Sequence, residues 1–330
     1  MVAHDRTDHR ILHALQLAPR APFARIAAVI GVSEQTVARR YQRMRTSGIV
    51  RVLARADETR TPGMSSWTLR IGCRPGTAAT LAEALARRDD TSWISLGAGG
   101  AEITCQATVH EHRAGLLNQL PRASNVLTFS AHQVLHRFVG RGEADWVAPG
   151  EELDAAGRAA LLEGTPSSTG DPDVRLEPAD AALMAALADD GRASWAALAA
   201  ATGGTQRQVA QRVAALTAAG AIYFHLDVAN SAVGIHTVAS LWFTIAPNHL
   251  AEAGARLADH TELAYAAAVT GRSNLMASAM CRDASALYRY LTTKVAEIPG
   301  VQSVETVPQL TRVKQAHFLI QDGRVRDPRA

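Results

Sequence analysis

One stretch of the sequence concentrates side chains that could bind a polyanion. Residues 33–50 read SEQTVARRYQRMRTSGIV, with a short polar start, four arginines and a glycine near the end. Guanidinium groups pair with phosphates and with the acceptor edge of guanine, and short polar side chains can reach base edges. The stretch therefore has the composition either of a helix that lies along a nucleic acid or of a solvated basic surface.

The charge distribution favours the nucleic-acid interpretation. Residues 1–60 hold eleven arginines against five acidic residues, a net charge of +6, whereas the whole chain carries +3. The basic excess of the protein is thus contained in its first sixty residues. A local excess of this kind indicates a polyanionic partner more strongly than the overall charge does.

The elements around this stretch must hold it at the surface. Ile11, Leu12 and Leu15 recur at helical spacing after Asp8, which can cap the helix start. Pro22 suits the first turn of a second helix, whose inner face begins with Phe23.

The basic stretch itself reads as a third helix between two glycines. Gly31 provides a sharp turn, Ser33 is a good N-cap, and Gly48 ends the helix before an extended segment. Two helices, a glycine turn and a basic third helix predict a helix-turn-helix, whose recognition helix enters the major groove. The predicted DNA contacts are Ser33, Gln35, Thr36, Arg39, Arg40, Arg43 and Arg45.

The chain contains an internal repeat at a shift of 172 residues. Asp8 falls on Asp180, Arg20 on Arg192, Phe23 on Trp195, Arg40 on Arg212 and, much later, Gly99 on Gly271. Residues 177–225 hold only three arginines against four acidic residues, so we expect the second head to be weakened or purely structural. Because the repeat retains both Asp8 and Arg40, a structural ion pair of Arg40 is as good an interpretation as a phosphate contact.

The second part of each copy alternates short strands and helices in the order β-α-β-β-α-β. This order predicts a ferredoxin-like antiparallel sheet with helices on one side, and hence an α+β fold class. The open face and edges need covering, which the other copy can provide. Trp195, Trp242 and Phe243 are expected to fill cores.

The predicted domains alternate between the two folds. They are a helix-turn-helix domain at 1–60, a ferredoxin-like ligand and oligomerisation domain at 61–140, a linker at 141–175 with a short helix at 153–162, a degenerate helix-turn-helix domain at 176–228, a second ferredoxin-like domain at 229–320 and a tail at 321–330.

These motifs resemble the Lrp/AsnC family of bacterial regulators. The carrying stretches are TDHRILHALQ, IAAVIGVSEQTVARRYQRMRTSGIV and, in the second copy, VTGRSNLMASAMC followed by IPGV before the last strand. The resemblance implies a transcriptional regulator in tandem form, with winged or three-helix DNA-binding heads and sheet domains of the AsnC type. It also implies double-stranded DNA as partner, a homodimer or higher homo-oligomer, and an amino acid or related effector held between the sheet domains.

The resemblance places the effector at the loop after the second strand. The implied effector residues are Thr270, Gly271, Arg272, Ser273 and Asn274 in the second copy, and Gly99, Gly100 and Glu102 in the first. The first copy reads LPRASNV where the family has IPGV, so its last turn differs.

Two further interpretations stay open. In the first, the chain is a ligand-binding co-regulator that does not itself bind DNA. In the second, it is an enzyme like the sirohaem decarboxylases, which are similar to this family and also occur as fused units. The stretches around the second and third strands offer little acid–base chemistry, so we expect no enzyme.

Composition excludes several other classes. A hydrophobic fraction of 47% with 20% charged residues is ordinary for a globular protein, no apolar run is long enough for a membrane helix, and we expect a cytoplasmic location. Three separated cysteines suit a reducing compartment. His9 and His13 have helical metal-ligand spacing but no nearby third ligand, so we expect neither a metal nor a cofactor.

Overall fold

The chain divides into two compact units, and each unit takes one half from each copy of the repeat. The computed structural model describes residues 5–57, 63–110, 115–140, 153–163, 174–315, 318–321 and 324–326. Unit 1 comprises Met1–Pro62 and Gly150–Ala232, and unit 2 comprises Gly63–Pro149 and Val233–Ala330. Both helix-turn-helix segments therefore fall in unit 1 and both sheet segments in unit 2.

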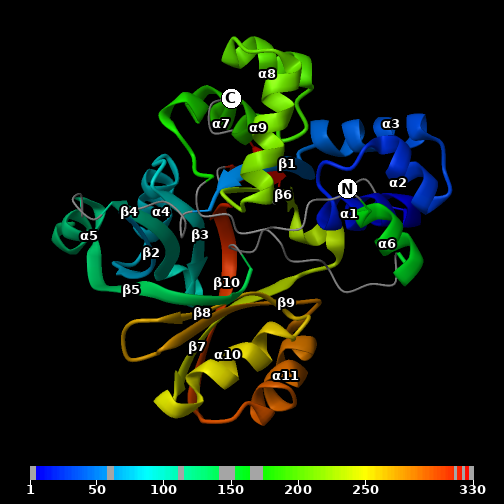
Figure 1. Cartoon of the computed structure of the whole chain (residues 1–330). Helices are drawn as coiled ribbons and strands as arrows, with labels where there is room; N and C mark the ends of the chain where they lie inside the picture. The colour runs from blue at the N-terminus through cyan, green and yellow to red at the C-terminus, as the bar shows by residue number, and fades with distance from the viewer. Residues whose placement is uncertain are drawn as a thin grey trace. The chain divides into compact units, whose positions relative to one another are not determined.

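The described residues of unit 1 form two sets of three α-helices and one additional α-helix (Figure 1). The first set is α1 (Arg6–Leu17), α2 (Phe23–Ile30) and α3 (Glu34–Thr46). The second set is α7 (Ala181–Asp189), α8 (Trp195–Thr202) and α9 (Gln206–Ala218). Helix α6 (Ala155–Leu162) lies in the predicted linker, most of which is outside the described residues.

Local capping chemistry sets the ends of the first three helices. Asp5, rather than Asp8, is the N-cap of α1, and the two carboxylates form a reciprocal capping box with each other's backbone N–H groups. The prediction that Asp8 caps the helix was thus wrong by three residues, because Asp8 occupies the third helical position. Ser33 caps α3 by accepting from the Thr36 N–H at 3.2 Å, and Gly31 takes the left-handed conformation at φ 74°.

Each helix set has its own apolar core. In the first set the side chains of Ile11, Leu15, Ile26, Val37 and Met44 are fully buried. In the second set, the core consists of Leu183, Leu187, Leu198, Val209, Val213 and Leu216, with contributions from Ala54 and Ile222. Ala54 belongs to the first copy and packs in the core of the second, so the two heads are structurally interdependent.

A two-stranded ribbon joins the two heads. Strands β1 (Val50–Ala56) and β6 (Ile222–Val228) pair antiparallel, with Leu53 opposite His225. These two residues are equivalents in the 172-residue repeat, so the ribbon pairs each strand with its own duplicate about a pseudo-two-fold axis. Such self-complementary pairing is the arrangement of an isologous dimer interface, here formed within one chain.

Two arginines repeat this pseudo-symmetry beside the ribbon. Arg20 donates to the carbonyl oxygens of Gly191 and Ala193 at 2.6 and 3.3 Å, and its guanidinium lies 4.4 Å from the Trp195 ring centre. Arg192 donates in return to the carbonyl oxygens of Pro19 and Ala21 at 2.6 and 2.9 Å. Its guanidinium lies 4.2 Å from the centre of the Phe23 ring.

The aromatic partner of Arg192 is Phe23, the repeat equivalent of Trp195. Trp195 is 37% exposed, so the prediction that it fills a core was wrong. Its indole instead supports a guanidinium from the other head, a cation–π contact that sequence spacing does not reveal.

Unit 2 contains the two predicted β-α-β-β-α-β segments. The first consists of β2 (Met64–Cys73), α4 (Ala78–Ala86), β3 (Thr91–Gly97), β4 (Glu102–His110), α5 (Gly115–Gln119) and β5 (Val126–Val139). The second consists of β7 (Thr237–Ile245), α10 (Leu250–Ala258), β8 (Leu263–Val269), β9 (Leu275–Cys281), α11 (Ala284–Thr292) and β10 (Val301–Lys314). Short strands β11 (Leu319–Gln321) and β12 (Arg324–Arg326) extend the sheet beyond β10.

Eight of these strands close into a barrel. The sheet order is β10-β3-β4-β2-β5-β8-β9-β7, and β7 also pairs with β10. Each copy keeps the ferredoxin-like order of its four strands, and the copies join through β5–β8 and β10–β3. Closure gives each of these eight strands at least two neighbours, which removes the open edges of the separate sheets.

The barrel separates outer cores from an inner one. Helices α10 and α11 cover one face of the second sheet (Figure 1), where Leu241, Phe243, Leu257 and Leu275 are buried. Trp242 points the opposite way and packs with Tyr265, Val269, Met276 and Val307. Trp242 and Phe243 are 1% and 0% exposed, so their prediction as core residues is confirmed.

Gly191 offers a direct test of how tightly the ribbon contacts the second head. A Cβ at this residue would lie 2.7–2.8 Å from the backbone of Leu53, and the Gly191 N–H donates to the Val52 carbonyl at 2.8 Å. We expect Gly191→Ala to reduce the free energy of unfolding by about 1–3 kcal/mol through overpacking, measured by urea denaturation.

Gly204→Ala is the matched control, because a Cβ there meets only ordinary contacts at 3.6 Å or more. Equal unfolding free energies of the two variants would show that the ribbon does not pack against Gly191 as described.

Candidate nucleic-acid interface and effector loops

Helix α3 divides into a buried face and an exposed one. Val37, Tyr41 and Met44 are buried against α1 and α2. The exposed side chains of the helix and its cap are those of Ser33, Glu34, Gln35, Arg39, Gln42, Arg43 and Thr46. The predicted contacts Gln35, Arg39 and Arg43 thus lie on the surface, whereas Arg40 and Arg45 are only partly exposed.

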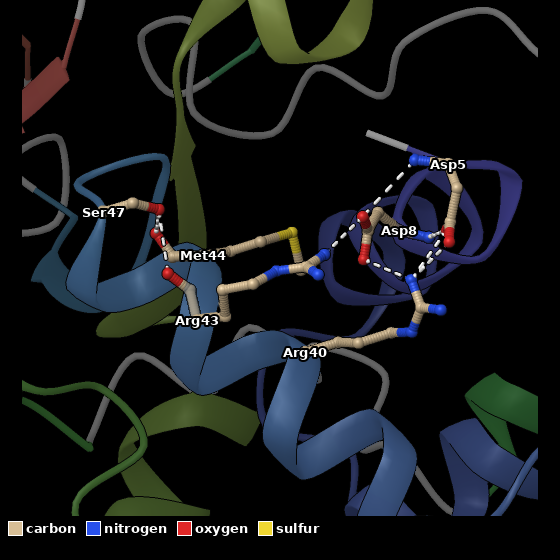
Figure 2. Close-up of polar contacts among 6 residues, drawn as sticks. All are labelled: Asp5, Asp8, Arg40, Arg43, Met44 and Ser47. Atoms are coloured by element: carbon tan, nitrogen blue, oxygen red, sulfur yellow. Dashed lines mark hydrogen bonds and ion pairs between the residues drawn. The ribbon is translucent and has the colours of Figure 1, made fainter. Parts of the chain in front are cut away.

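Arg40 is held by two carboxylates at the start of α1 (Figure 2). Its Nη1 lies 2.7 Å from Asp5 Oδ2 and 3.0 Å from Asp8 Oδ1. The Asp5 carboxylate accepts from the Asp8 N–H and from Arg40, which holds its pKa below the usual range, and both carboxylates raise the pKa of Arg40. Of the two interpretations of Arg40, the structural ion pair is the one that the geometry provides.

Arg43 and Arg45 each contact one carboxylate and are partly exposed to solvent. Arg43 extends from α3 toward the same acid, with Nη2 2.6 Å from Asp8 Oδ2, and its side chain is 48% exposed (Figure 2). Asp8 itself is 1% exposed, so Arg43 presents a guanidinium to solvent while anchored on a buried carboxylate. Arg45 lies 3.0 Å from Asp190, an acid of the second head.

The second head keeps the arginine–aspartate ion pair but has no arginine at the positions equivalent to Arg39, Arg43 and Arg45. Arg212 contacts Asp180 at 2.6 Å, and the Asp180 carboxylate accepts from the Glu177 N–H, as Asp8 does from that of Asp5. Arg39, Arg43 and Arg45 correspond to Gln211, Ala215 and Thr217. The arginine common to both heads therefore stabilises the fold, and those special to α3 change its surface charge.

The polar start of α3 is partly used by the helix cap. The hydroxyls of Ser33 and Thr36 lie 2.9 Å apart, and Ser33 accepts from the Thr36 N–H. Gln35 is exposed at the same end of the helix. Gln35 is therefore the predicted base-reading side chain that the cap leaves available.

The effector loop of the second copy makes several structural contacts. The Thr270 carbonyl accepts from His132 Nδ1 at 2.7 Å, and its hydroxyl accepts from the Gln133 N–H at 2.8 Å. Gly271 has φ 113°, and a Cβ on it would lie 2.6 Å from His132 Nδ1. The hydrogen bonds of Thr270 and the lack of room for a side chain at Gly271 both result from the close fit of this loop against β5 of the first copy. This fit explains why threonine and glycine occupy these two positions.

Asn274 at the end of the loop is also engaged by backbone. Its side chain accepts from the Ile245 N–H at 2.9 Å and donates to the Ile245 carbonyl at 2.8 Å. Arg272 is exposed and Ser273 partly so. Thr270 and Asn274 thus make structural contacts through their side chains, whereas the side chains of Arg272 and Ser273 are exposed or partly exposed.

The corresponding loop of the first copy is built differently. Gly99 and Gly100 have φ 69° and 84°, conformations that favour glycine. Glu102 accepts a bidentate pair from Arg70 at 2.9 Å, and Arg70 also donates to Glu305 at 2.8 Å. These carboxylates raise the pKa of Arg70, whose guanidinium lies 5.0 Å from the Trp242 ring centre.

Sequence patterns did not identify Arg70, His132 or Arg20 as important side chains. Each makes at least one contact with the other copy of the repeat, and such contacts depend on how the copies pack. The alignment of Arg20 with Arg192 was the one available signal, because the same residue type at equivalent positions of two packed copies is consistent with a reciprocal contact.

Neither a metal site nor a membrane span emerges from the described residues. Within them, no three His, Cys, Asp or Glu side chains gather in a way that could hold a metal ion. No helix in the same ranges is long and apolar enough to cross a membrane.

Paired helix-turn-helix heads and a barrel of two ferredoxin-like domains define a class of DNA-binding protein. Its members carry, beside the DNA-binding heads, a domain of the kind that binds small ligands. The AsnC-type helix-turn-helix domain matches residues 5–45 and again 178–217, and the Lrp/AsnC ligand binding domain matches residues 238–317. The chain belongs to the Lrp/AsnC family and is a transcriptional regulator of that type.

Two similar relatives are uncharacterised HTH-type transcriptional regulators of archaea. The relative from Pyrococcus furiosus is 30% identical over 110 residues, which are 33% of this chain and 74% of that protein. The relative from Pyrococcus abyssi is 29% identical over 143 residues, 43% of this chain and 90% of that protein. Both are shorter than this chain, as expected for relatives of a tandem form.

A solved structure resembles the whole tandem arrangement. The siroheme decarboxylase NirDL matches with a TM-score of 0.61 and 12% identity, covering 94% of this chain and 93% of that one. At this identity the likeness concerns the fold alone.

The ion pair of the second head tests how each helix-turn-helix is held together. Arg212 holds the pKa of Asp180 below its ordinary value of 3.8, so the stability from this pair is present above that value and is lost as the pH falls through the lower, folded-state pKa. We expect Arg212→Gln to reduce the free energy of unfolding by about 1–3 kcal/mol at neutral pH. The difference from the wild type should narrow between about pH 4 and pH 2 in urea titrations.

Arg207→Gln, on the exposed side of the same helix, is the control and should leave stability nearly unchanged. If the difference in unfolding free energy between the wild type and Arg212→Gln stays constant over this pH range, Arg212 stabilises the head by packing and not through the Asp180 carboxylate.

Proposed function

We propose that α3 of the first head is the DNA-reading helix and that α9 of the second head is mainly its fixed partner. The observation that carries the proposal is the contrast between their equivalent exposed faces. Arg39 and Arg43 are exposed on α3, and Gln211 and Ala215 take their places on α9. A duplex would therefore meet strong phosphate neutralisation at one half-site and little at the other.

The contacts of the α3 side chains suggest a separate role for each of them in DNA binding. Arg39 and Arg43 bind phosphates, Gln35 and the polar N-terminal turn face base edges, and Arg40 acts as a positioning residue for the helix. Arg43 can swing between Asp8 and a phosphate with little loss, because its guanidinium is already half in solvent. Arg45 contributes less than first expected, since Asp190 of the second head holds it.

We propose further that a small amino-acid-type effector binds at the tips of the 99–102 and 270–274 loops. The ligand binding domain matched over 238–317 supports ligand binding by unit 2 in general. Arg272 and Ser273 are the side chains free to face such a ligand, whereas Thr270, Gly271 and Asn274 position the loop. An effector acts only if it prefers one arrangement of the heads over another.

Association of whole chains, as a homodimer or larger assembly, also belongs to this proposal. The eight barrel strands already have at least two neighbours each, so another chain would use a surface outside the closed sheet. Leu135 on β5 and Leu310 on β10 are 61% and 63% exposed and offer apolar contact area. A homodimer of chains would present two arginine-bearing heads.

A binding role accounts for unit 2 better than catalysis does. Three charged groups on its barrel strands, Arg70, Glu102 and Glu305, are paired with one another. The likeness to the decarboxylase NirDL extends to the fold and not to the sequence. We therefore infer a regulator that binds its effector without transforming it.

The DNA proposal predicts a specific salt dependence. The double variant Arg39→Gln/Arg43→Gln should reduce the slope of log K against log salt by about 2, because two phosphate contacts are lost. The measurement is an electrophoretic shift, over a salt series, on a duplex from the region beside the protein's own gene.

Arg207→Gln on α9 is the matched control and should preserve the slope. An unchanged slope in the double variant, or a large loss in Arg207→Gln, would place the reading surface elsewhere. Because Arg43 also contacts Asp8, the melting temperature of each variant is measured in parallel.

The effector proposal predicts separate effects of the loop residues. An amino acid effector at a free concentration of 100 times its Kd should stabilise the protein by about 2.7 kcal/mol, which is measured as a rise in melting temperature. Arg272→Ala should abolish this rise without changing the melting temperature of the free protein. Asn274→Ala should lower the melting temperature of the free protein, because two hydrogen bonds to Ile245 are lost.

Arg256→Ala on α10 serves as the control for removing a surface arginine. A ligand-induced rise that survives in Arg272→Ala would remove this loop from the binding site.

A further inference from the structure

A pocket of about 390 Å³ opens on the second ferredoxin-like domain, away from the effector loop. It lies where β8 begins and β9 ends, and the 270–274 loop joins the other ends of the same two strands. Each strand has seven residues, so the two sites are roughly 20 Å apart along the hairpin. We call this second site the distal pocket; its lining comes from residues 233–235, 262, 280–282, 286, 289, 290 and 293.

The floor of the distal pocket is apolar and uncharged. Ile235, Met280, Cys281 and Tyr290 line it, and all four are buried. Burial raises the pKa of the Cys281 thiol to about 11, so it is neutral at physiological pH. The Tyr290 hydroxyl is hydrogen-bonded to His260 Nδ1 at 3.1 Å. An apolar group placed here would lose no hydrogen bond and leave no charge buried.

The rim of the pocket is cationic. Arg282 and Arg289 both line it and are exposed. Lys294 lies 2.8 Å from Glu262, so the acid on the rim is neutralised by a neighbour. Asp283 lies 3.3 Å from Arg282 Nε but also caps α11 by accepting from the Ala286 N–H at 2.8 Å. The lining therefore holds two guanidiniums and one acid, Glu262, and that acid is already paired with Lys294.

The same position in the first copy lacks this chemistry. Arg282 and Arg289 correspond to His110 and Leu117, and Tyr290 corresponds to Asn118. Glu262 corresponds to Asp90, which is bound to Arg88 at 2.7 Å. The cationic rim is thus not a by-product of the ferredoxin-like fold, because the duplicated fold exists in this chain without it.

We propose that the distal pocket binds a small organic monocarboxylate. Its carboxylate pairs with Arg282 and Arg289, and its apolar chain lies on the floor formed by Ile235, Met280 and Tyr290. The volume lies within the range of about 300–1,000 Å³ common for small-molecule sites, and planar guanidiniums match a carboxylate. This site is separate from the proposed effector loops, and its occupation does not depend on DNA binding.

The test is binding of 4-methylpentanoate to the full chain without DNA. Isothermal titration calorimetry gives the affinity, and the methyl resonance of Met280, labelled with ¹³C and assigned by Met280→Leu, reports the location. We expect saturable binding that shifts Met280, and at least about tenfold weaker binding in Arg282→Gln/Arg289→Gln. Arg289→Lys should retain part of the affinity because it keeps the charge.

Arg256→Gln is the matched control, because this exposed arginine on α10 is paired with Glu252 and does not line the pocket. The uncharged analogue 4-methylpentan-1-ol should bind at least about tenfold more weakly than the acid. The proposal is overturned if the acid does not shift Met280, if the alcohol binds equally well, or if Arg256→Gln weakens binding as much as the double variant.

Discussion

The reciprocal contact of Arg20 and Arg192 is the constraint on which the structure of unit 1 depends. Each arginine crosses to the other head, donates to two loop carbonyls there and stacks on an aromatic ring. Desolvation lowers the pKa of both guanidiniums, that of Arg20 to about 10, so Arg20 remains charged at neutral pH. Charges that are partly removed from solvent need polar partners, and here each head supplies those partners for the other's arginine.

Unit 2 follows the same principle with a different structure. Its two sheets close into one barrel, and Arg70 of the first copy reaches Glu305 of the second. An arrangement that would otherwise need two identical chains is thus built from two unequal halves. Once both halves are on one chain, each can diverge separately. The second head could dispense with the equivalents of Arg39 and Arg43 while keeping Asp180 and Arg212. The second sheet domain could acquire the cationic rim of the distal pocket.

Much of the fold was predictable because it depends on local patterns. Glycine turns, caps and apolar spacing gave the helices around Ser33 and Gly48, and the 172-residue repeat gave the order of the strands. The capping error at Asp8 had a local cause too, since Asp5 precedes it by three residues and both can accept backbone hydrogen bonds.

The site was less predictable, because sequence spacing does not tell whether an arginine faces solvent or an acid. Arg39 and Arg40 are neighbours with different surroundings: one is exposed and the other is held by Asp5 and Asp8. Contacts between the copies were further out of reach. His132 against Thr270 and Arg20 over Trp195 join residues that are more than a hundred positions apart.

The most direct measurement of the central claim is to map which head lies along the duplex. Cys73, Cys105 and Cys281 are buried, so a cysteine introduced at an exposed position can carry an iron chelate that cleaves nearby DNA. Gln35→Cys on α3 and Arg207→Cys on α9 occupy equivalent positions in the two heads. If α3 is the reading helix, a bound duplex will be cleaved strongly and locally from position 35 and only weakly from position 207. Equal cleavage from both positions, or stronger cleavage from 207, would contradict the assignment of α3 as the reading helix.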